Sequence, residues 1–361
     1  MNIKTKLICL IAILIVIFVL YTQKEIYVSK VKYFDAHVEG SEKKVILYYT
    51  KCFNDENFYF GSGDIFKECP VRNCYATSNK LLMPIEKFDA LMFHGYEYDS
   101  LKEKPKKRSP HQRYIFFNLE SAANTKNLDK FGKFYNWTMT FRKDSDFIRP
   151  YGSVVKKDTS YTLPSVESIK KRKHKIAWFV SHCKTKGFRE KLVKEMQKYV
   201  DIDIYGRCGN KTCSRDSNKC YDYLEKNYKF YLSFENTVCN DYVTEKLFNV
   251  LDKNVIPIVY GGANYSAIAP PHSVIDVSKF QTVPDLVNYI NKIDSNISAY
   301  MNFFNWKKHY VTHRSIKNTL CNLCKKLNEK SEKVYSDIQM WWNGVNMSQC
   351  STFPQIIKSI I

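Results

Sequence analysis

Four polar side chains of different chemistry follow one apolar stretch of this chain. The run Phe230–Phe234 has the apolar, aromatic character of a buried strand, and it leads through a polar turn to a helix that we expect over 243–252, with Asp241 as its N-cap. An amide, a phenol, a carboxylate and an ammonium group lie near that helix start, on Asn236, Tyr242, Glu245 and Lys246. Free backbone N–H groups and the helix dipole favour an anion at such a place. The pattern predicts a site for a sugar diphosphate; the alternative is an ordinary strand–helix connection with a solvated Glu-Lys pair.

Two basic residues are candidates for holding the diphosphate. Lys246 lies in the first turn of the expected helix, where the positive end of the dipole disfavours a cation unless an anion is near. Arg189 lies near the start of another helix, expected over 188–199 after a strand-to-helix turn, and Lys184 or Lys186 could replace it. The alternative for each of these residues is an ordinary surface charge.

Short apolar runs bounded by turn residues predict strands along most of the chain. We expect strands over 44–50, 88–94, 114–119, 175–181, 201–206, 229–234 and 255–260, and helices over 188–199, 243–252 and 284–293. Strands that alternate with helices of this length indicate parallel sheets joined by crossover helices. The sequence therefore predicts an α/β fold of two Rossmann-like domains facing a cleft. No G-x-G-x-x-G motif follows a strand, which argues against a dinucleotide cofactor.

The composition fits a globular protein with a basic surface. A chain of 361 residues can hold two domains of ordinary size. Its net charge of +20 suits an acidic partner, such as nucleic acid, an anionic membrane surface or a nucleotide sugar. The basic residues are scattered, and the densest runs, 102–108 and 170–175, predict an exposed loop and a linker. This distribution argues against nucleic acid as the partner.

The N-terminal segment decides the expected compartment. An apolar run without charge, Leu7–Tyr21, follows Lys4 and Lys6. It is shorter than the roughly 20 residues that span a typical bilayer, although thinner internal membranes need fewer. A cleaved signal peptide is the alternative, but no Ala-x-Ala cleavage site follows the run. We expect a single-pass signal anchor over 7–21, a cytoplasmic tail over 1–6 and a polar stem over 22–43.

Cysteine usage fits an oxidising compartment. The chain has 12 cysteines. In a secreted or lumenal protein they predict disulfides, here among Cys69, Cys74, Cys208, Cys213, Cys220, Cys239, Cys321 and Cys324, with Cys350 near the end. A zinc site made by Cys69, Cys74, Cys321 and Cys324 is the alternative, and spacing alone leaves the connectivity open. N-x-(S/T) sequons fit the same compartment, at Asn136, Asn210, Asn264, Asn296 and Asn346.

These residues, with others in the same order along the chain, resemble the α1,3-fucosyltransferase family. In that family, Phe-Glu-Asn followed by Asp-Tyr-(Val/Ile)-Thr-Glu-Lys-Leu is the signature for GDP-fucose, and this chain has it at 234–236 and 241–247. The resemblance continues over 117–121, 140–146, 150–152, 255–261 and 269–280, and it covers roughly residues 45–325.

The resemblance implies a domain order and a disulfide link. It implies a GT-B arrangement in which an acceptor-binding domain (44–155) is followed by a linker (156–174), a GDP-fucose-binding domain (175–325) and a C-terminal extension (326–361). It also implies that the Cys-x-x-Cys pair of Cys321 and Cys324 is tied back to the N-terminal domain.

The resemblance further implies a reaction and roles for its residues. Fucose transfer needs groups that hold the diphosphate, stabilise a positively charged sugar and take the proton of the acceptor hydroxyl. The β-linked donor gives an α-linked product, so a single inverting displacement suffices. Glu120, just past the strand at 114–119, resembles the family's base, and Glu245 resembles the carboxylate that contacts fucose and is the rival base. The remaining candidates are expected at the donor's phosphates, sugars or guanine, on Asn236, Tyr242, Glu235 and Tyr205.

Asp144 and Asp146 have the spacing of the D-x-D motif, in which two carboxylates hold a metal that bridges a diphosphate. Here the pair lies beside Arg142 and Lys143, far along the chain from the donor signature. The family's fold binds its donor without an obligatory metal. We therefore expect a structural or acceptor-side pair and no obligatory cofactor, and stimulation by a divalent metal stays open.

The expected protein is thus a Golgi enzyme, a single-pass type II membrane protein with a lumenal catalytic domain. It would move L-fucose from GDP-fucose to O3 of N-acetylglucosamine on glycoprotein glycans. Core-type N-glycan acceptors are favoured slightly over antennal Lewis-type acceptors, because the cysteines of 208–239 and the segment Gly206–Gly209 resemble invertebrate-type members. The alternative is a carbohydrate-binding lumenal protein of the same fold without catalysis. The oligomeric state is not predicted.

Overall fold

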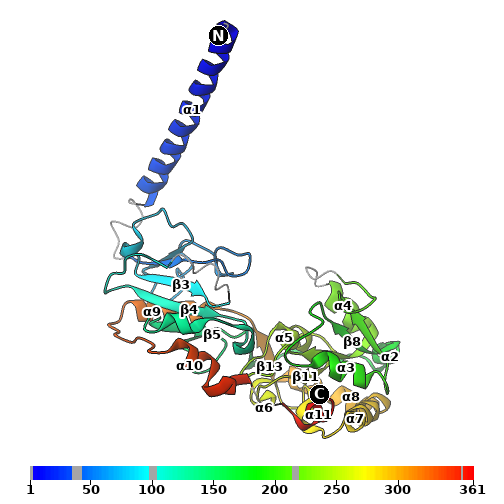
Figure 1. The fold of residues 1–361 in the computed structure, drawn as a ribbon. Helices are drawn as coiled ribbons and strands as arrows, with labels where there is room; N and C mark the ends of the chain where they lie inside the picture. Colours follow the sequence, from blue (N-terminus) through cyan, green and yellow to red (C-terminus); the bar gives the residue numbers. More distant parts are fainter. Residues whose placement is uncertain (1–2, 35–42, 97–103, 214–218, 351–352) are drawn as a thin grey trace. The chain divides into compact units, whose positions relative to one another are not determined.

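The structure of the protein is a computed structural model that describes residues 3–34, 43–96, 104–213, 219–350 and 353–361 (Figure 1). The chain divides into two units. Unit 1 comprises Met1–Phe93, Asp99–Tyr114 and Leu320–Ser331, and unit 2 comprises His94–Tyr98, Ile115–Thr319 and Glu332–Ile361. Every residue that the sequence predicts for catalysis or donor binding lies in unit 2.

Parallel strands form the centre of unit 1. Strand β1 (Lys44–Tyr48) pairs in parallel with both β2 (Cys74–Thr77) and β3 (Ala90–His94). Except for the partly buried Tyr75, their apolar side chains are buried, as expected for strands of a parallel sheet. The 3-10 helix η2 (Ile85–Lys87) precedes β3, and most of helix α9 (Lys317–Leu327) also belongs to this unit.

Two disulfides join helix α9 to the strand region of unit 1. Cys69 pairs with Cys321, and Cys74 pairs with Cys324. The expected link from the Cys-x-x-Cys pair back to the N-terminal domain is confirmed. The zinc alternative is wrong, because all four sulfur atoms are in disulfide bonds.

Helix α1 (Ile3–Phe34) contains the apolar run that the sequence predicts as a membrane anchor. Its large apolar side chains between Leu10 and Tyr21 are exposed. Across the residues that the structure describes, no helix combines the length and the apolar character that a membrane span needs.

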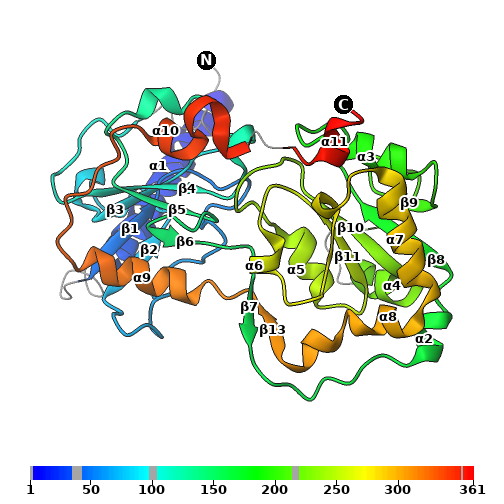
Figure 2. The same ribbon diagram turned by 90° about the horizontal axis from the view of Figure 1, so that it is seen from below.

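The site is positioned by the five-stranded parallel sheet of unit 2 (Figure 2). Its order is β12-β11-β10-β8-β9, made by β8 (His174–Phe179), β9 (Ile202–Tyr205), β10 (Tyr228–Phe234), β11 (Ile256–Tyr260) and β12 (Ile275–Asp276). All but β12 match strands predicted from the sequence. The chain runs from β8 to β9 on one side and returns to β10 on the other. Such a reversal is a topological switch point, where ligands bind beside the carboxyl ends of the strands.

Successive residues of a strand point to opposite faces of a sheet, and here both faces carry apolar side chains. Helices therefore pack on both faces. Phe230 belongs to an apolar cluster with α3 (Arg189–Met196) and α7 (Val283–Ser295). The next residue, Tyr231, belongs to a cluster with α4 (Lys219–Asn227) and α5 (Glu245–Leu251). The crossover helices expected from the sequence therefore sandwich the sheet.

The remaining elements lie outside this sheet. Strand β4 (Arg113–Asn118) pairs in parallel with β5 (Trp137–Thr140), which pairs in parallel with β6 (Phe147–Ile148). Strand β7 (Ser153–Lys156) pairs antiparallel with β13 (Tyr310–His313). The other helices are α2 (Val166–Lys170), α6 (Tyr265–Ile268), α8 (Ile297–Asn302), α10 (Ile338–Asn343), α11 (Gln355–Lys358) and the 3-10 helices η4 (Ala122–Asn124), η5 (Leu128–Phe131), η6 (Val277–Lys279), η7 (Asn305–Lys308) and η8 (Val345–Cys350).

Helix α5, which carries predicted site residues, begins later than the sequence predicts. Thr244, not Asp241, is its N-cap, and the Thr244 hydroxyl accepts a hydrogen bond from the N–H of Lys246. Asp241 instead has a left-handed backbone, with φ of 58°, and its carboxylate accepts a hydrogen bond from the N–H of Lys143. Both residue types can cap a helix. Here the buried carboxylate of Glu235 selects Thr244, because it accepts hydrogen bonds from the Thr244 N–H and hydroxyl.

Candidate active site

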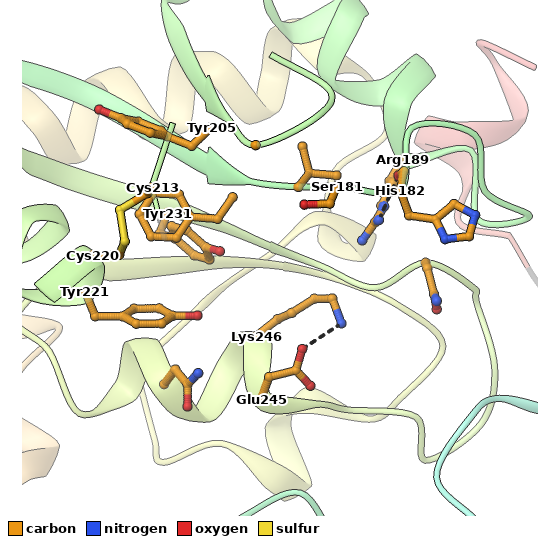
Figure 3. Close-up of a pocket in the computed structure, with 15 residues that line it drawn as sticks. Ser181, His182, Arg189, Tyr205, Cys213, Cys220, Tyr221, Tyr231, Glu245 and Lys246 are labelled. Carbon is orange, nitrogen blue, oxygen red and sulfur yellow. Dashed lines mark hydrogen bonds and ion pairs between the residues drawn. A yellow bond between two sulfur atoms is a disulfide. The ribbon is translucent and has the colours of Figure 1, made fainter. Parts of the chain in front are cut away.

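A pocket of about 470 Å³ lies at the carboxyl ends of β8, β9 and β10 (Figure 3). It is lined by the turns that follow these strands and by the first turns of α3 and α5. The structure thus brings together most of the residues predicted to bind the donor, namely Arg189, Tyr205, Asn236, Glu245 and Lys246.

Lys246 lies in the first turn of α5, with its ammonium group beside two carboxylates. Its Nζ atom is 3.2 Å from Glu235 Oε2 and 3.3 Å from Glu245 Oε1, and it donates a hydrogen bond to the Thr244 hydroxyl. Desolvation lowers the pKa of Lys246, but the charges of Glu235 and Glu245 outweigh it and raise the pKa above its ordinary value. The side chain is therefore a cation at neutral pH, although the helix dipole disfavours one at this position.

Glu235 holds this end of α5 in place and does not line the pocket. Its side chain is only 1% exposed, and its Oε1 atom accepts hydrogen bonds from the Thr244 N–H at 2.8 Å and hydroxyl at 3.0 Å. Burial raises the pKa of Glu235, although the charge of Lys246 opposes that rise. The structure therefore contradicts the expectation that Glu235 reaches ribose or guanine, because its carboxylate is used inside the protein.

Arg189, the first residue of α3, is a buried cation rather than an ordinary surface charge. It is 3% exposed. Its guanidinium donates hydrogen bonds to the carbonyl of Phe234 at 2.8 Å and to that of His182 at 3.1 Å, which ties it to the ends of β10 and β8. Its charge also acts on Lys246, where it opposes the rise in pKa. An anion bound between these two cations would relieve their repulsion.

Glu245 and Asn236 line the same part of the pocket. Partial desolvation raises the pKa of Glu245, but the charge of Lys246 outweighs this effect and holds the pKa of Glu245 below its ordinary value. Glu245 is therefore an anion at neutral pH. The Oδ1 atom of Asn236 is buried and has no hydrogen-bond partner among the residues described. Such an atom is costly to leave unpaired, so a ligand that donates a hydrogen bond to it would be stabilised.

The other end of the pocket is aromatic (Figure 3). The ring centroid of Phe179, at the end of β8, lies 5.2 Å from that of Tyr205, 5.2 Å from that of Tyr231 and 5.7 Å from that of Tyr221. The hydroxyl groups of Tyr205 and Tyr228 are 2.8 Å apart and hydrogen-bonded, which fixes the Tyr205 ring. Aromatic walls of this kind suit a planar nucleobase. Of these aromatic residues, only Tyr205 was predicted from the sequence, because aromatic residues beside a strand have the same pattern as core residues.

Tyr242 and Glu120, also predicted from the sequence, do not line the pocket. Tyr242 is 2% exposed, and its ring centroid lies 5.1 Å from that of Phe141. Glu120 follows the end of β4, and its Oε2 atom accepts a hydrogen bond from the Asn124 side chain at 3.0 Å. Burial raises the pKa of Tyr242, and the charges of Tyr151 and Glu120 raise it further. The charge of Glu120 therefore lies near enough to Tyr242 to raise the pKa of its hydroxyl. The role of Glu120 as the base stays a prediction.

Disulfides brace the loops around this pocket. Cys183 pairs with Cys208, which ties the turn after β8 to the turn after β9, and Cys213 pairs with Cys220 beside the aromatic end. A third disulfide joins Cys239 to Cys350. Cys183 was not predicted as a disulfide candidate, because spacing along the chain does not reveal which loops meet in space.

One predicted glycosylation site conflicts with the fold. Asn136 is 4% exposed, and its side-chain amide donates a hydrogen bond to the Lys333 carbonyl at 2.9 Å. A glycan on that nitrogen would disrupt this contact, so the fold disfavours modification at Asn136, and glycosylation there stays a prediction. The other four sequon asparagines are exposed, namely Asn210, Asn264, Asn296 and Asn346.

The D-x-D carboxylates have separate protein partners. Asp144 makes a bidentate pair with Arg142, and Asp146 accepts hydrogen bonds from Thr138 and Tyr335. These contacts fit the structural interpretation of the pair, and the acceptor-side alternative stays a prediction. Within the described part of the chain, no group of three or more His, Cys, Asp or Glu side chains is arranged to hold a metal ion.

Comparisons with known proteins identify the family. Residues 41–152 match the N-terminal fucosyltransferase domain, and residues 169–341 match the C-terminal domain of glycosyltransferase family 10 (fucosyltransferase). The chain is 37% identical to alpha-(1,3)-fucosyltransferase C of Drosophila melanogaster, over 85% of this chain and 80% of that protein. It is 35% identical to glycoprotein 3-alpha-L-fucosyltransferase A of the same species, over 80% and 58% of the two chains. A crystal structure of an alpha1,3-fucosyltransferase with GDP-fucose, 16% identical, covers 83% of this chain and 98% of its own with a TM-score of 0.54, which shows a common GT-B-like α/β fold. The chain therefore belongs to glycosyltransferase family 10, and within it to the α-1,3-fucosyltransferases.

Proposed function

We propose that this enzyme moves L-fucose from GDP-fucose to O3 of N-acetylglucosamine on glycoprotein N-glycans, with inversion at the fucose C1 atom. The pocket at the switch point of the sheet carries the proposal, because its lining combines the cations Arg189 and Lys246 with an aromatic end. A protein of the same fold was crystallised with GDP-fucose, which supports this choice of donor.

The two ends of the pocket fit different parts of the donor. The diphosphate lies between Arg189 and Lys246, whose positive groups donate charge-assisted hydrogen bonds to its oxygen atoms. The guanine lies at the aromatic end, beside Tyr205. The fucose lies near Glu245, and the unpaired Oδ1 atom of Asn236 accepts a hydrogen bond from the donor.

Transfer then needs one displacement. The acceptor O3 atom attacks fucose C1 on the face opposite the diphosphate, the bond from C1 to the GDP oxygen breaks, and Glu120 takes the O3 proton. Arg189 and Lys246 stabilise the charge that develops on the leaving GDP. Glu245 is the weaker candidate for the base, because Lys246 lowers its pKa and so its affinity for a proton. Its negative charge instead stabilises the positively charged fucosyl group in the transition state.

The same cations bear on the need for a metal. In D-x-D transferases a divalent ion neutralises the diphosphate, whereas here two protein cations line the donor pocket. We therefore propose that GDP-fucose binds without an obligatory metal.

We propose the asparagine-linked N-acetylglucosamine of the N-glycan core as the preferred acceptor. The cysteine pattern of 208–239 and the similarity to a glycoprotein 3-alpha-L-fucosyltransferase support this choice. Incubation with GDP-fucose and a panel of defined core and antennal glycans, read by mass spectrometry, tests it. The proposal predicts a mass gain of one fucose on the core residue. Fucose only on antennal acceptors would contradict the preference, and no product from any acceptor would contradict the reaction.

We further propose that the enzyme is a type II protein of the Golgi membrane, anchored by residues 7–21. The exposed apolar side chains of helix α1 support an anchor, because such a surface is unfavourable in water. Extraction of cell membranes at alkaline pH tests this proposal. An anchored enzyme stays in the membrane fraction, whereas release into the supernatant would exclude the anchor.

A further inference from the structure

The C-terminal end of the chain supplies no residue to the lining of the donor pocket. The family match ends at residue 341. Beyond it, the structure describes η8 and α11 within residues 345–350 and 353–361, which we call the C-terminal segment. This segment belongs to unit 2, and it contacts two loops that carry donor-pocket residues.

The first contact is with the loop 236–244, between β10 and α5. Cys350 of the segment is disulfide-bonded to Cys239 of the loop. Beside this bond, the Asn240 N–H donates a hydrogen bond to the Gln349 carbonyl at 2.8 Å, and the Asn240 side chain donates one to the Gln349 side-chain oxygen at 3.1 Å. A covalent bond and two hydrogen bonds thus fasten the loop only a few residues from Asn236.

This loop depends on such contacts for its shape. It contains no α-helix or β-strand of its own, and Asp241 has a left-handed backbone. Gly262 approaches it so closely that an added Cβ atom there would lie 2.7 Å from the Cys239 backbone. Packing on Gly262 and fastening to the C-terminal segment therefore both restrict the loop that begins with Asn236 and ends just before Glu245.

The second contact is with the start of α3. Ile356 and Ile357 are fully buried in the apolar cluster of the five-stranded sheet, which anchors α11. From there Phe353 places its ring 5.5 Å from the ring of Phe188. Phe188 has a left-handed backbone, with φ of 54°, and directly precedes Arg189. The segment therefore also packs on the residue that directly precedes Arg189, the buried cation of the pocket.

We propose that the C-terminal segment is a clamp that positions Arg189 and Asn236 for the nucleoside diphosphate sugar. This rests on the proposed donor site, and it makes Cys350, Gln349 and Phe353 positioning residues that do not touch the donor. A clamp of this kind raises the fraction of molecules whose pocket is already in the binding shape. Apparent affinity falls in proportion to that fraction when the clamp is removed.

The test compares GDP binding by calorimetry, and the KM values of donor and acceptor, in full-length enzyme in detergent. The Cys239→Ser/Cys350→Ser variant is expected to bind GDP about tenfold more weakly, if the free loop keeps its binding shape about a tenth of the time. Its KM for GDP-fucose should rise, while its KM for the acceptor and its kcat at saturating donor stay near wild type. Gln349→Ala and Phe353→Ala, which leave every disulfide intact, should shift GDP affinity in the same direction by a smaller factor.

The matched control is Cys69→Ser/Cys321→Ser, which removes a disulfide from unit 1. It is expected to lower the Tm and to leave GDP affinity unchanged, so it separates lost stability from lost positioning. Wild-type GDP affinity in all three clamp variants would overturn the clamp while leaving the donor site intact. Equal weakening in the control would overturn it as well. A wild-type enzyme that fails to bind GDP would instead contradict the proposed donor site. If the double serine variant does not fold, the Gln349 and Phe353 variants decide the outcome.

Discussion

Replacing Lys246 with methionine perturbs the donor pocket selectively, because it removes the charge and keeps most of the side-chain volume. In the proposed complex the ammonium group donates a charge-assisted hydrogen bond to the diphosphate, and such bonds contribute about 1.5–3 kcal/mol. The Lys246 side chain is 23% exposed, so solvent screens part of this interaction. We therefore expect a loss of about 2 kcal/mol, or about 30-fold in GDP affinity. Acceptor KM is expected to stay near wild type.

The same substitution has a second effect that needs its own control. It leaves the buried carboxylate of Glu235 without its cation, which lowers the stability of the fold. The variant Glu235→Gln/Lys246→Met removes that unpaired charge. It is therefore expected to recover part of the lost thermal stability and none of the lost GDP affinity.

Calorimetric titration of GDP and thermal unfolding of both variants measure these two effects separately. Undiminished GDP affinity in Lys246→Met would refute the contact between Lys246 and the diphosphate. Recovery of GDP affinity in the double variant would also refute it, because the first loss would then come from distortion of α5.

Three further predictions follow from other parts of the structure. Glu120→Gln is expected to bind GDP-fucose like wild type and to lose about 10²–10⁴-fold in turnover, and unchanged turnover would remove Glu120 from the role of base. Burial lowers the pKa of Lys307 to about 8 from an ordinary 10.5, so between these pH values the folded protein binds fewer protons than the unfolded chain. The free energy of unfolding of the wild type should then rise with pH across that interval, by on the order of 3 kcal/mol relative to that of Lys307→Met. Denaturant unfolding of both proteins at several pH values measures this difference, and the same dependence on pH in both would contradict it. Asn136→Gln should leave the glycan mass of the protein expressed in eukaryotic cells unchanged, and the loss of one glycan would show that Asn136 is modified.

The strands that position the site are visible in the sequence because they are short, apolar and bounded by turn residues. Strand β10 and the polar residues after it are predicted together, and the switch point then brings Asn236, Glu245 and Lys246 to one pocket. The start of α5 is not predicted correctly, since Asp241 and Thr244 are both good caps by local chemistry. The choice depends on the carboxylate of Glu235, which is near Thr244 only in the folded chain.

Other features depend on contacts that leave no local pattern. Arg189 has the same sequence context as an exposed helix residue, yet the carbonyls of Phe234 and His182 hold it inside the pocket wall. The disulfide between Cys183 and Cys208 joins two turns whose proximity follows from the pairing of β8 with β9. Such residues could be placed only once the strand order was known.

A crystal structure of this enzyme with GDP would show directly whether the pocket between β8 and β10 holds the donor's diphosphate. We expect the two phosphate groups to lie at the carboxyl ends of β8 and β10, with oxygen atoms within about 3 Å of the Lys246 ammonium and the Arg189 guanidinium. GDP bound at any other place, or bound with both of these side chains turned away from its phosphates, would contradict the proposed donor site.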